Sequence, residues 1–144
     1  MSLHVPNGVA GEALTICRVV YGDPTAQGSL EFFMADSSAV EPFGITPEGS
    51  ELPPVGSNDT TVAVSAGREI CIAGRGHTAL CRVHTTGVVA GQRVKVAAAN
   101  GIVGALVGSE SGGEWTVGIA LKTALSGELA PIWVDPLQIA RPSS

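Results

Sequence analysis

The sequence contains few aromatic and few charged residues. Aromatic residues make up 4% of the 144 positions and charged residues 15%, whereas about 25% of an ordinary soluble domain is charged. Because 44% of the residues are hydrophobic, the core must be built mainly from Val, Ile, Leu and Ala. So few charges indicate that part of the surface is covered by other copies of the chain or by another protein. A small-residue core with glycine-rich loops would give the same composition without a partner.

Long apolar runs and basic clusters are missing as well. No stretch approaches the roughly 20 apolar residues of a membrane-spanning helix. The first residues do not combine a basic region with an apolar one, as a secretion signal would. Lys and Arg occur singly and the net charge is −5, so no basic stripe is available to neutralise phosphates. We therefore expect neither a membrane nor a nucleic acid as partner.

The three cysteines are too few and too irregularly spaced for a disulfide framework. Cys17, Cys71 and Cys81 are an odd number in a chain long enough to fold without covalent links. We expect all three thiols to be free, in a protein made in a reducing cytoplasm.

Helical periodicity is absent from every window of a dozen residues, and β-branched residues dominate the apolar runs. From Thr60 onward, short apolar runs alternate with glycine-bearing turns about every 8–12 residues, a spacing typical of sandwiches and barrels. We predict an all-β fold, a single compact β-sandwich or small β-barrel of one domain. Strands are expected at residues 13–21, 30–35, 61–64, 69–73, 79–84, 92–107 (a hairpin), 114–122 and 130–134.

Two of these segments carry specific signals. Asn100-Gly101 lies between the two halves of the hairpin, and both residues tolerate the positive φ angles of a tight turn. On the strand at 114–122 one face is almost entirely small, so another sheet or subunit could approach it closely. Pro131 indicates that the last strand lies at a sheet edge or begins there.

The remaining segments are expected to lie outside the regular strands. Residues 36–59 are rich in proline and glycine and are predicted to form a long loop within a β domain spanning 13–135. Residues 1–12 are expected to form an extended N-terminal arm, and residues 136–144 a C-terminal tail. Leu3, Val5 and Val9 give the arm apolar side chains at alternate positions, so they are the candidate partner-binding residues.

No catalytic or metal-binding motif stands out. Four residues of the kind that bind zinc fall within 14 positions: Cys71, His77, Cys81 and His84. If residues 79–84 form a strand, Cys81 and His84 face opposite sides of the sheet and cannot share a metal. A Cys–His nucleophile would need a neighbouring base and an oxyanion site, for which the sequence offers no pattern. We therefore expect no metal, no cofactor and no enzymatic activity.

The acidic residues likewise form no pair at an identifiable site. Glu110 and Glu114 flank a glycine loop, where solvated charges are common.

An ordered set of turn-and-strand patterns fills the C-terminal half. The segments are AGQRVKV (90–96), NGIV (100–103), VGIAL (117–121), SGE (126–128) and IWV (132–134). AGREI (66–70) repeats the turn-then-strand form, and GIT (44–46) resembles a tripeptide that recurs in the family named in the next sentence. Over residues 40–135 the order of these segments resembles that of the capsid decoration proteins of tailed bacteriophages, also called cement or head-stabilising proteins. The chain departs from that pattern at Gln92, where an acidic residue is common, and at the bulky Trp115 and Trp133.

The resemblance implies a compact, β-tulip-like domain that binds the outer surface of an assembled capsid. Such proteins commonly form trimers, sometimes dimers, and clamp neighbouring major capsid proteins against the pressure of internal DNA. The implied partners are the major capsid protein and further copies of the chain, and the implied location is the outer surface of the virion. Two alternatives stay open: another phage or cellular β module, such as a fibre, tail or carbohydrate-binding domain, and an enzyme of unknown type.

Overall fold

The computed structural model describes residues 7–25, 28–48, 62–108 and 110–140. These residues form twelve strands in three sheets and contain no helix, hence none that could cross a membrane. The predicted all-β fold is confirmed. The expected strands recur with shifted or shortened bounds, because turns interrupt several of the apolar runs.

The N-terminal sheet has five short strands. They are β1 (Gly8–Ala10), β3 (Val19–Pro24), β4 (Leu30–Met34), β5 (Gly44–Ile45) and β7 (Glu69–Ile70). Their order across the sheet is β5-β3-β4-β1-β7. A separate two-stranded sheet of β2 (Leu14–Thr15) and β6 (Val62–Val64) packs against it and supplies three residues of their shared core.

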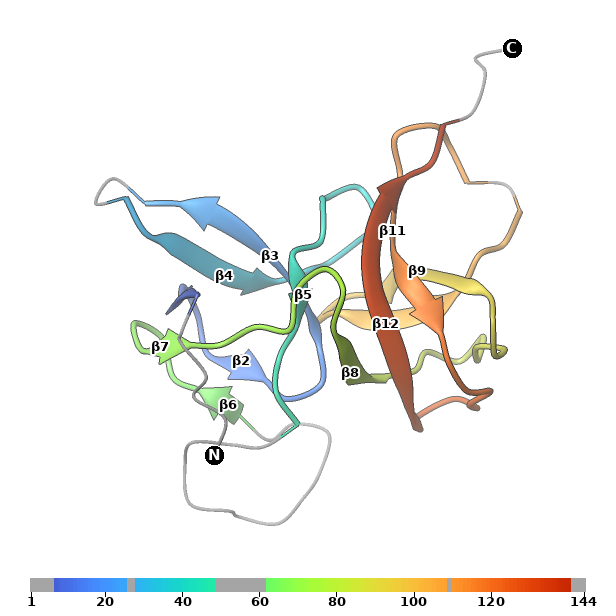
Figure 1. Cartoon of the computed structure of the whole chain (residues 1–144), viewed down its shortest axis with the longest axis horizontal. Helices are drawn as coiled ribbons and strands as arrows, with labels where there is room; N and C mark the ends of the chain where they lie inside the picture. Colours follow the sequence, from blue (N-terminus) through green and yellow to red (C-terminus); the bar gives the residue numbers. More distant parts are fainter. Residues whose placement is uncertain (1–6, 26–27, 49–61, 109, 141–144) are drawn as a thin grey trace.

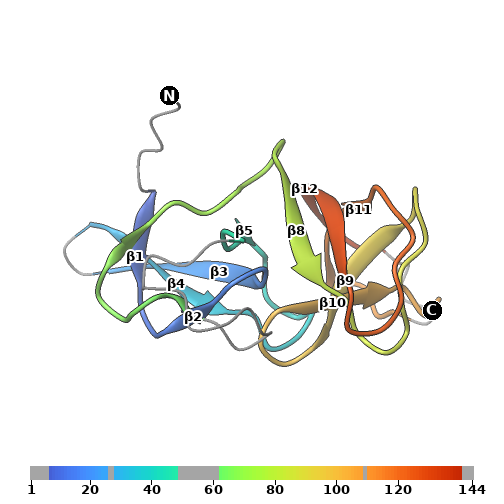
Figure 2. The same cartoon turned by 90° about the horizontal axis from the view of Figure 1, so that it is seen from below.

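The C-terminal sheet is longer and strongly curved. Its strands are β8 (Thr78–Arg82), β9 (Arg93–Ala98), β10 (Ile102–Ala105), β11 (Trp115–Ala120) and β12 (Leu129–Gln138). In the order β10-β9-β11-β12-β8 all neighbours are antiparallel, and the sheet curls into a half-barrel. The two five-stranded sheets lie side by side, with β5 and β8 near their junction (Figures 1 and 2).

The interior is aliphatic, as the composition predicts. One buried cluster fills the curl of the C-terminal sheet and also takes in residues from the N-terminal half, so it continues across the junction between the sheets. Its N-terminal members are Val19, Ala35 and Ile45, with exposed fractions of 0%. A second cluster around Phe32 lies between the N-terminal sheet and the β2–β6 pair.

The predicted hairpin is confirmed. β9 and β10 pair antiparallel, and Asn100 and Gly101 have φ angles of 68° and 70° in the turn between them. Left-handed angles at both positions match the preference of the Asn-Gly pair for such turns. All three thiols are free, as expected.

The small face predicted on the strand at 114–122 is covered by the chain itself. The pairing of β11 with β12 shifts register between Thr116 and Gly118, so the simple alternation of sides breaks there. A Cβ atom on Gly118 would overlap the carbonyl of Trp133, which shows how closely β12 lies against this position. Thr116, Gly118 and Ala120 are buried. The small residues therefore let two strands of one sheet meet, and they do not form a surface for a subunit.

Pro131 lies in an interior strand, not at an edge. β12 is hydrogen-bonded to β11 on one side and β8 on the other. The sheet tolerates the missing N–H of Pro131 for two reasons. On the β11 side Pro131 lies opposite Leu121, just after β11 has ended at Ala120. On the β8 side it lies opposite Leu80, whose main chain does not bond to it.

Three predicted boundaries are wrong. Residues 8–10 of the predicted arm form β1, a strand with neighbours on both sides. Residues 136–138 of the predicted tail continue β12. The predicted loop at 36–59 contains β5, whose Gly44-Ile45 pairs with β3. In each case pairing partners distant in the sequence hold a segment that lacks the alternation of an isolated strand. Residues 1–6, 49–59 and 141–144 of these predicted segments lie outside the described residues.

Candidate functional site

The outward side of β12 carries a row of exposed apolar side chains. Leu129, Trp133 and Leu137 have exposed fractions of 38%, 38% and 45%, whereas their inward neighbours Ile132 and Val134 have 0%. The cross-strand pairs Ile119–Trp133 and Leu80–Pro131 add side chains of β11 and β8 on the same side. We call this set the outer apolar face; it consists of Leu80, Ile119, Leu129, Pro131, Trp133 and Leu137.

The charges beside this face are paired with one another. Asp135 lies between Trp133 and Leu137 on β12 and accepts from Arg75 at 2.7 Å and from Arg93 at 2.8 Å. The hydrogen bond from Arg93, helped by the charges of both arginines, lowers the pKa of Asp135 below its ordinary value. A partner could therefore cover the face without leaving the Asp135 carboxylate unpaired.

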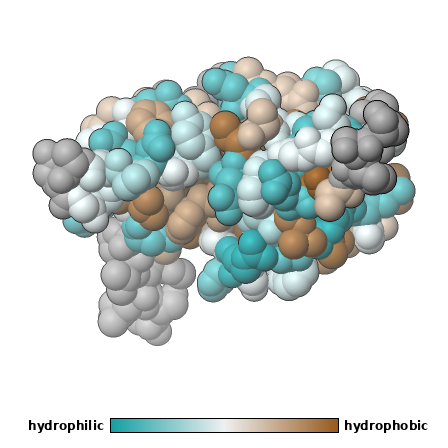
Figure 3. Space-filling view, turned by 90° about the horizontal axis from the view of Figure 1, so that it is seen from above, coloured by the Kyte–Doolittle hydropathy of each residue, from teal (hydrophilic) through white to brown (hydrophobic). Residues whose placement is uncertain are grey.

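Other exposed apolar side chains are distributed over the loops at the ends of the C-terminal sheet. Leu125 in the turn before β12 is 70% exposed, and Val107 after β10 is 64% exposed. The side of the molecule seen in Figure 3 carries hydrophobic residues in separate small groups interspersed with hydrophilic ones. The outer apolar face differs from these groups because its members lie on paired strands with fixed spacing.

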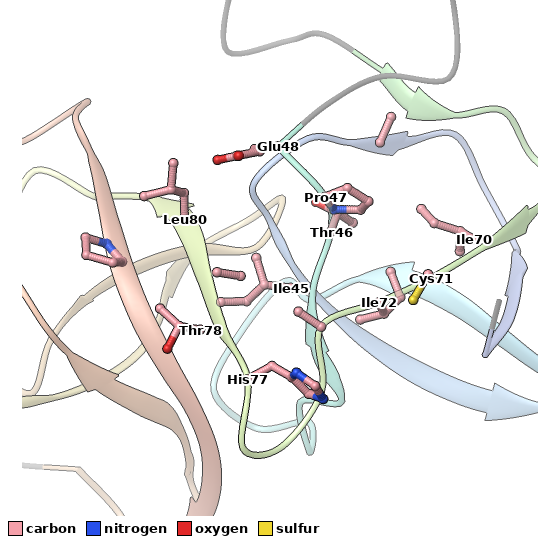
Figure 4. Close-up of a pocket in the computed structure, with 14 residues that line it drawn as sticks. Ile45, Thr46, Pro47, Glu48, Ile70, Cys71, Ile72, His77, Thr78 and Leu80 are labelled. Carbon is pink, nitrogen blue, oxygen red and sulfur yellow. The ribbon is translucent and has the colours of Figure 1, made fainter. Parts of the chain in front are cut away.

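An apolar pocket lies at the junction of the two sheets. It has a volume of ≈ 630 Å³, within the range of small-ligand sites. Figure 4 shows β8 on one side and residues 45–48 and 70–72 on the other, with Glu48 and His77 toward opposite ends. The pocket is lined by Ile45, Thr46, Pro47, Glu48, Ala63, Ile70, Cys71, Ile72, Ala73, His77, Thr78, Ala79, Leu80 and Pro131. Leu80 and Pro131 belong to both the pocket and the outer apolar face, so the two are continuous.

The edge of β8 that adjoins the pocket is partly free. The carbonyl of His77 and the N–H of Val83 bond to β12 or the turn before it. Because antiparallel main-chain groups alternate in direction, those of Thr78, Leu80 and Arg82 point away from β12. The N–H of Arg82 donates to the carbonyl of Cys17 at 3.0 Å. Within the part of the chain that the structure describes, the N–H groups of Thr78 and Leu80 meet no such acceptor.

Of the candidate partner-binding residues, the structure describes Val9, which does not lie at this site. Val9 lies in β1, half-buried, opposite Glu31 of β4 and Glu69 of β7. It is therefore part of the N-terminal sheet and not of an arm. Leu3 and Val5 lie outside the described residues.

The cysteines and histidines considered as zinc ligands are separated by the fold. Cys81 is fully buried, and its thiol donates to the carbonyl of Gly101 at 3.6 Å. Burial raises the pKa of Cys81 to about 12. Cys71 and His77 line the pocket, whereas His84 follows β8 near Thr85. Among the described residues no three His, Cys, Asp or Glu side chains are grouped to hold a metal ion.

The expectation of a solvated Glu110 is wrong. Glu110 is 2% exposed. Its carboxylate accepts hydrogen bonds from the N–H groups of Val107 at 2.5 Å and Gly108 at 2.9 Å, and it forms an ion pair with Lys95 at 3.1 Å. Burial alone would raise the pKa of Glu110, but these donors lower it to about 2. Glu110 thus fastens the loop between β10 and β11 to the sheet and has no visible role in the pocket.

Sequence reasoning missed both parts of the site for different reasons. The outer apolar face was detectable, since residues 129, 131, 133, 135 and 137 alternate with buried ones, had the last strand been extended beyond 134. The pocket had no such signal, because it joins segments from 45–48, 70–73, 77–80 and 131.

Comparison with known proteins assigns the chain to no family, since no family model matches its sequence and no curated protein does.

Proposed function

We propose that this chain is a non-enzymatic decoration protein, which binds the outer surface of an assembled bacteriophage capsid and clamps neighbouring major capsid proteins. On this proposal the protein is synthesised in the host cytoplasm and acts in the virion. It binds as a homo-oligomer, and we favour a trimer over a dimer. The observation that carries the proposal is the outer apolar face on β8, β11 and β12. The segment order over residues 40–135 supports the choice of a capsid as the partner.

The outer apolar face has the properties of a protein-binding surface. Trp133 lies near the middle of β12, with Leu129 and Leu137 four residues to either side. Tryptophan is one of the residue types enriched among those that contribute most binding free energy at protein interfaces. A rigid sheet also presents them without the entropy loss that ordering a loop would require.

The charge arrangement fits a surface that stays bound over a wide range of salt concentrations. Asp135 is neutralised by Arg75 and Arg93 of the same chain, so attachment would rely on apolar contacts more than on screened charges. A decoration protein that must hold a shell against outward pressure needs contacts of this kind.

One specific observation favours a second candidate function. An exposed indole, that of Trp133, can also stack on a sugar ring, as in a carbohydrate-binding domain of a fibre or tail. The two functions differ in what the same side chain contacts, so one set of variants can separate them.

Co-sedimentation tests the proposal directly. The chain is mixed with assembled, DNA-free shells of tailed bacteriophages, and with unassembled capsid protein as a control. We expect saturable binding to the shells and little binding to the unassembled protein. No binding to shells, together with retention on a glycan array, would overturn the capsid proposal in favour of the carbohydrate one.

A further inference from the structure

We propose that the pocket beside β8 binds an extended segment of another protein as an additional strand. The segment carries aliphatic side chains at alternate positions and a basic residue at its amino end. The inference rests on the proposed function only for the source of the segment, which on that function is the major capsid protein.

The free stretch of β8 presents main-chain donors and acceptors at strand spacing. The N–H and carbonyl groups of Thr78 and Leu80 point away from β12, whereas the next outward N–H, that of Arg82, donates to the carbonyl of Cys17. Among the described residues, none bonds to the four groups of Thr78 and Leu80. Two alternate residues of an extended main chain supply the matching acceptors and donors, and an aliphatic small molecule supplies neither. The edge therefore selects a peptide main chain.

This stretch also lacks the features that usually protect an exposed strand edge. Thr78, Ala79 and Leu80 include no proline and no charge, and they pair with consecutive residues of β12. The opposite edge of the same sheet, at β10, is bonded to another part of the chain, since the N–H of His84 donates to the carbonyl of Val103 at 2.7 Å. The C-terminal sheet thus leaves an unprotected edge at β8, directly beside the pocket.

The lining of the pocket determines which side chains such a segment carries. Its buried part includes Ile45, Ile70 and Ile72, and no aromatic ring is among the lining residues. Branched aliphatic side chains pack well against such a surface, and alternate residues of a strand project to the same side. The pocket therefore favours a segment with aliphatic residues at every second position.

A strand added to β8 continues the outer apolar face. In an antiparallel pair, residues directly opposite each other place their side chains on the same side of the sheet. Leu80 and Pro131 belong to both the pocket and the outer apolar face. A segment paired with β8 thus lies next to the surface that the proposed function assigns to the capsid, so one partner protein reaches both.

The charge at one end of the pocket sets the position of the basic residue. Glu48 is exposed, lies at the end of the pocket near Leu80 (Figure 4), and takes part in none of the ion pairs between described residues. A segment antiparallel to β8, the more stable orientation per residue, begins at this end. A lysine or arginine before its first aliphatic residue therefore lies beside the Glu48 carboxylate.

The Cys71 thiol offers a direct readout of pocket occupancy. Cys71 lines the pocket and is half-buried, whereas Cys17 and Cys81 are 2% and 0% exposed. The probe is the peptide acetyl-Lys-Thr-Val-Thr-Val-Thr-amide, added to the full-length protein before alkylation with N-ethylmaleimide. At ten times its Kd the peptide should slow Cys71 alkylation about elevenfold, because only about one pocket in eleven stays free. The same peptide with aspartate in place of both valines is the matched control and should give no protection.

Two N-methylated peptides test whether the main chain is recognised. In one of them both valines carry an N-methyl group, and in the other all three threonines do. Because successive N–H groups of a strand point to opposite edges, only one of these two sets faces β8. One peptide should therefore lose its protection of Cys71 and the other should keep it. An equal effect of the two would indicate an apolar contact without strand pairing and would overturn the inference.

Variants of the protein test the edge and the charge separately. Thr78→Pro removes an N–H that points away from β12, so it should abolish protection and keep the melting temperature. Thr78→Val keeps that N–H and is the matched control, which the peptide should protect as it does wild type. Glu48→Gln should weaken binding of the lysine peptide roughly two- to fivefold, the range of an exposed ion pair. It should leave binding of a peptide with glutamine in place of lysine unchanged. If Thr78→Pro lowers the melting temperature, the N-methylated peptides decide the question with the unaltered protein.

Two further results would overturn the inference. One is the absence of Cys71 protection at millimolar peptide. The other is slower Cys71 alkylation as the protein alone is concentrated, which would place a second copy of the chain in the pocket.

Shell co-sedimentation separates this inference from the proposed function. Peptide protection without shell binding keeps the strand-addition site and rejects the capsid function. Shell binding that neither Thr78→Pro nor saturating peptide weakens keeps the capsid function and overturns this inference.

Discussion

The N–H of Val19 donates to the carbonyl of Gly101 at 2.9 Å, which links the start of β3 to the tip of the β9–β10 hairpin. The N–H of Gly101 in turn donates to the carbonyl of Ala35 at 2.7 Å, and the Arg18 guanidinium donates to the carbonyl of Asn100 at 3.2 Å. The hairpin tip thus lies against the N-terminal half, where it holds the two five-stranded sheets together.

Gly101→Ala should destabilise the protein more than any other glycine-to-alanine change at an equivalent backbone angle. An added Cβ would overlap main-chain atoms of Val19, which cannot move without breaking the link between the sheets. Gly91→Ala is the control, because Gly91 also has a positive φ but has open space around it. We expect Gly91→Ala to cost about 1–2 kcal/mol for the backbone angle, and Gly101→Ala about 1–3 kcal/mol more for the overlap. Urea unfolding measures both losses of stability. Equal losses for the two variants would show that the main chain of Val19 can move aside at little cost.

Glu110→Gln should lower the stability of the folded protein at neutral pH and make that stability less dependent on pH under acidic conditions. The folded pKa of Glu110, about 2, lies below the ordinary value of 4.5. Its contribution to stability is therefore complete above pH 4.5 and is lost as the pH falls toward 2. Replacing the carboxylate leaves buried donors poorly satisfied, at about 1–3 kcal/mol. Glu41→Gln, at an exposed position, is the control. Melting temperatures between pH 7 and 2 should converge for wild type and Glu110→Gln, and a constant difference would contradict this role.

Trp133→Ser should impair shell binding while leaving the fold intact. Trp133 is 38% exposed on the outward side of β12, and its removal takes away the largest side chain of the outer apolar face. The loss of a central aromatic residue from an interface costs about 2 kcal/mol or more, roughly 30-fold in Kd. Leu125→Ser, in the turn before β12, removes an even more exposed apolar residue outside this face and should bind normally. If both variants bind shells as tightly as wild type, the face is not the contact.

Removal of residues 1–10 should lower the melting temperature strongly. The deletion takes out β1, which lies between β4 and β7. It also removes the bonds from the N–H groups of Asn7 and Ala10 to the carbonyls of Ile70 and Arg68. Each such bond contributes about 1 kcal/mol, and the two flanking strands would lose their shared neighbour. Thermal unfolding of the truncated protein at the same temperature as the full chain would show that β1 is dispensable.

Several elements could be predicted because their signals are local. Asn-Gly between two strands favours a tight turn in which both residues have positive φ angles, and Asn100 and Gly101 have such angles here. Predictions failed where distant partners decided the outcome. Gly8–Ala10 forms a strand because β4 and β7 flank it. Glu110 accepts from two N–H groups of its own loop, but the charge that pairs with it is on Lys95 of another strand, β9.

The sequence by itself determined the all-β class, the aliphatic core and the turns between strands, since these depend on residue type and short-range spacing. Only the tertiary structure decided which surfaces are free. The alternation of Leu129, Trp133 and Leu137 becomes an exposed face because β8 and β11 take the two edges of β12. The pocket exists because the curl of one sheet leaves the edge of β8 beside residues 45–48 of the other half. Such surfaces arise from the packing of segments far apart along the chain, and local patterns carry no record of that packing.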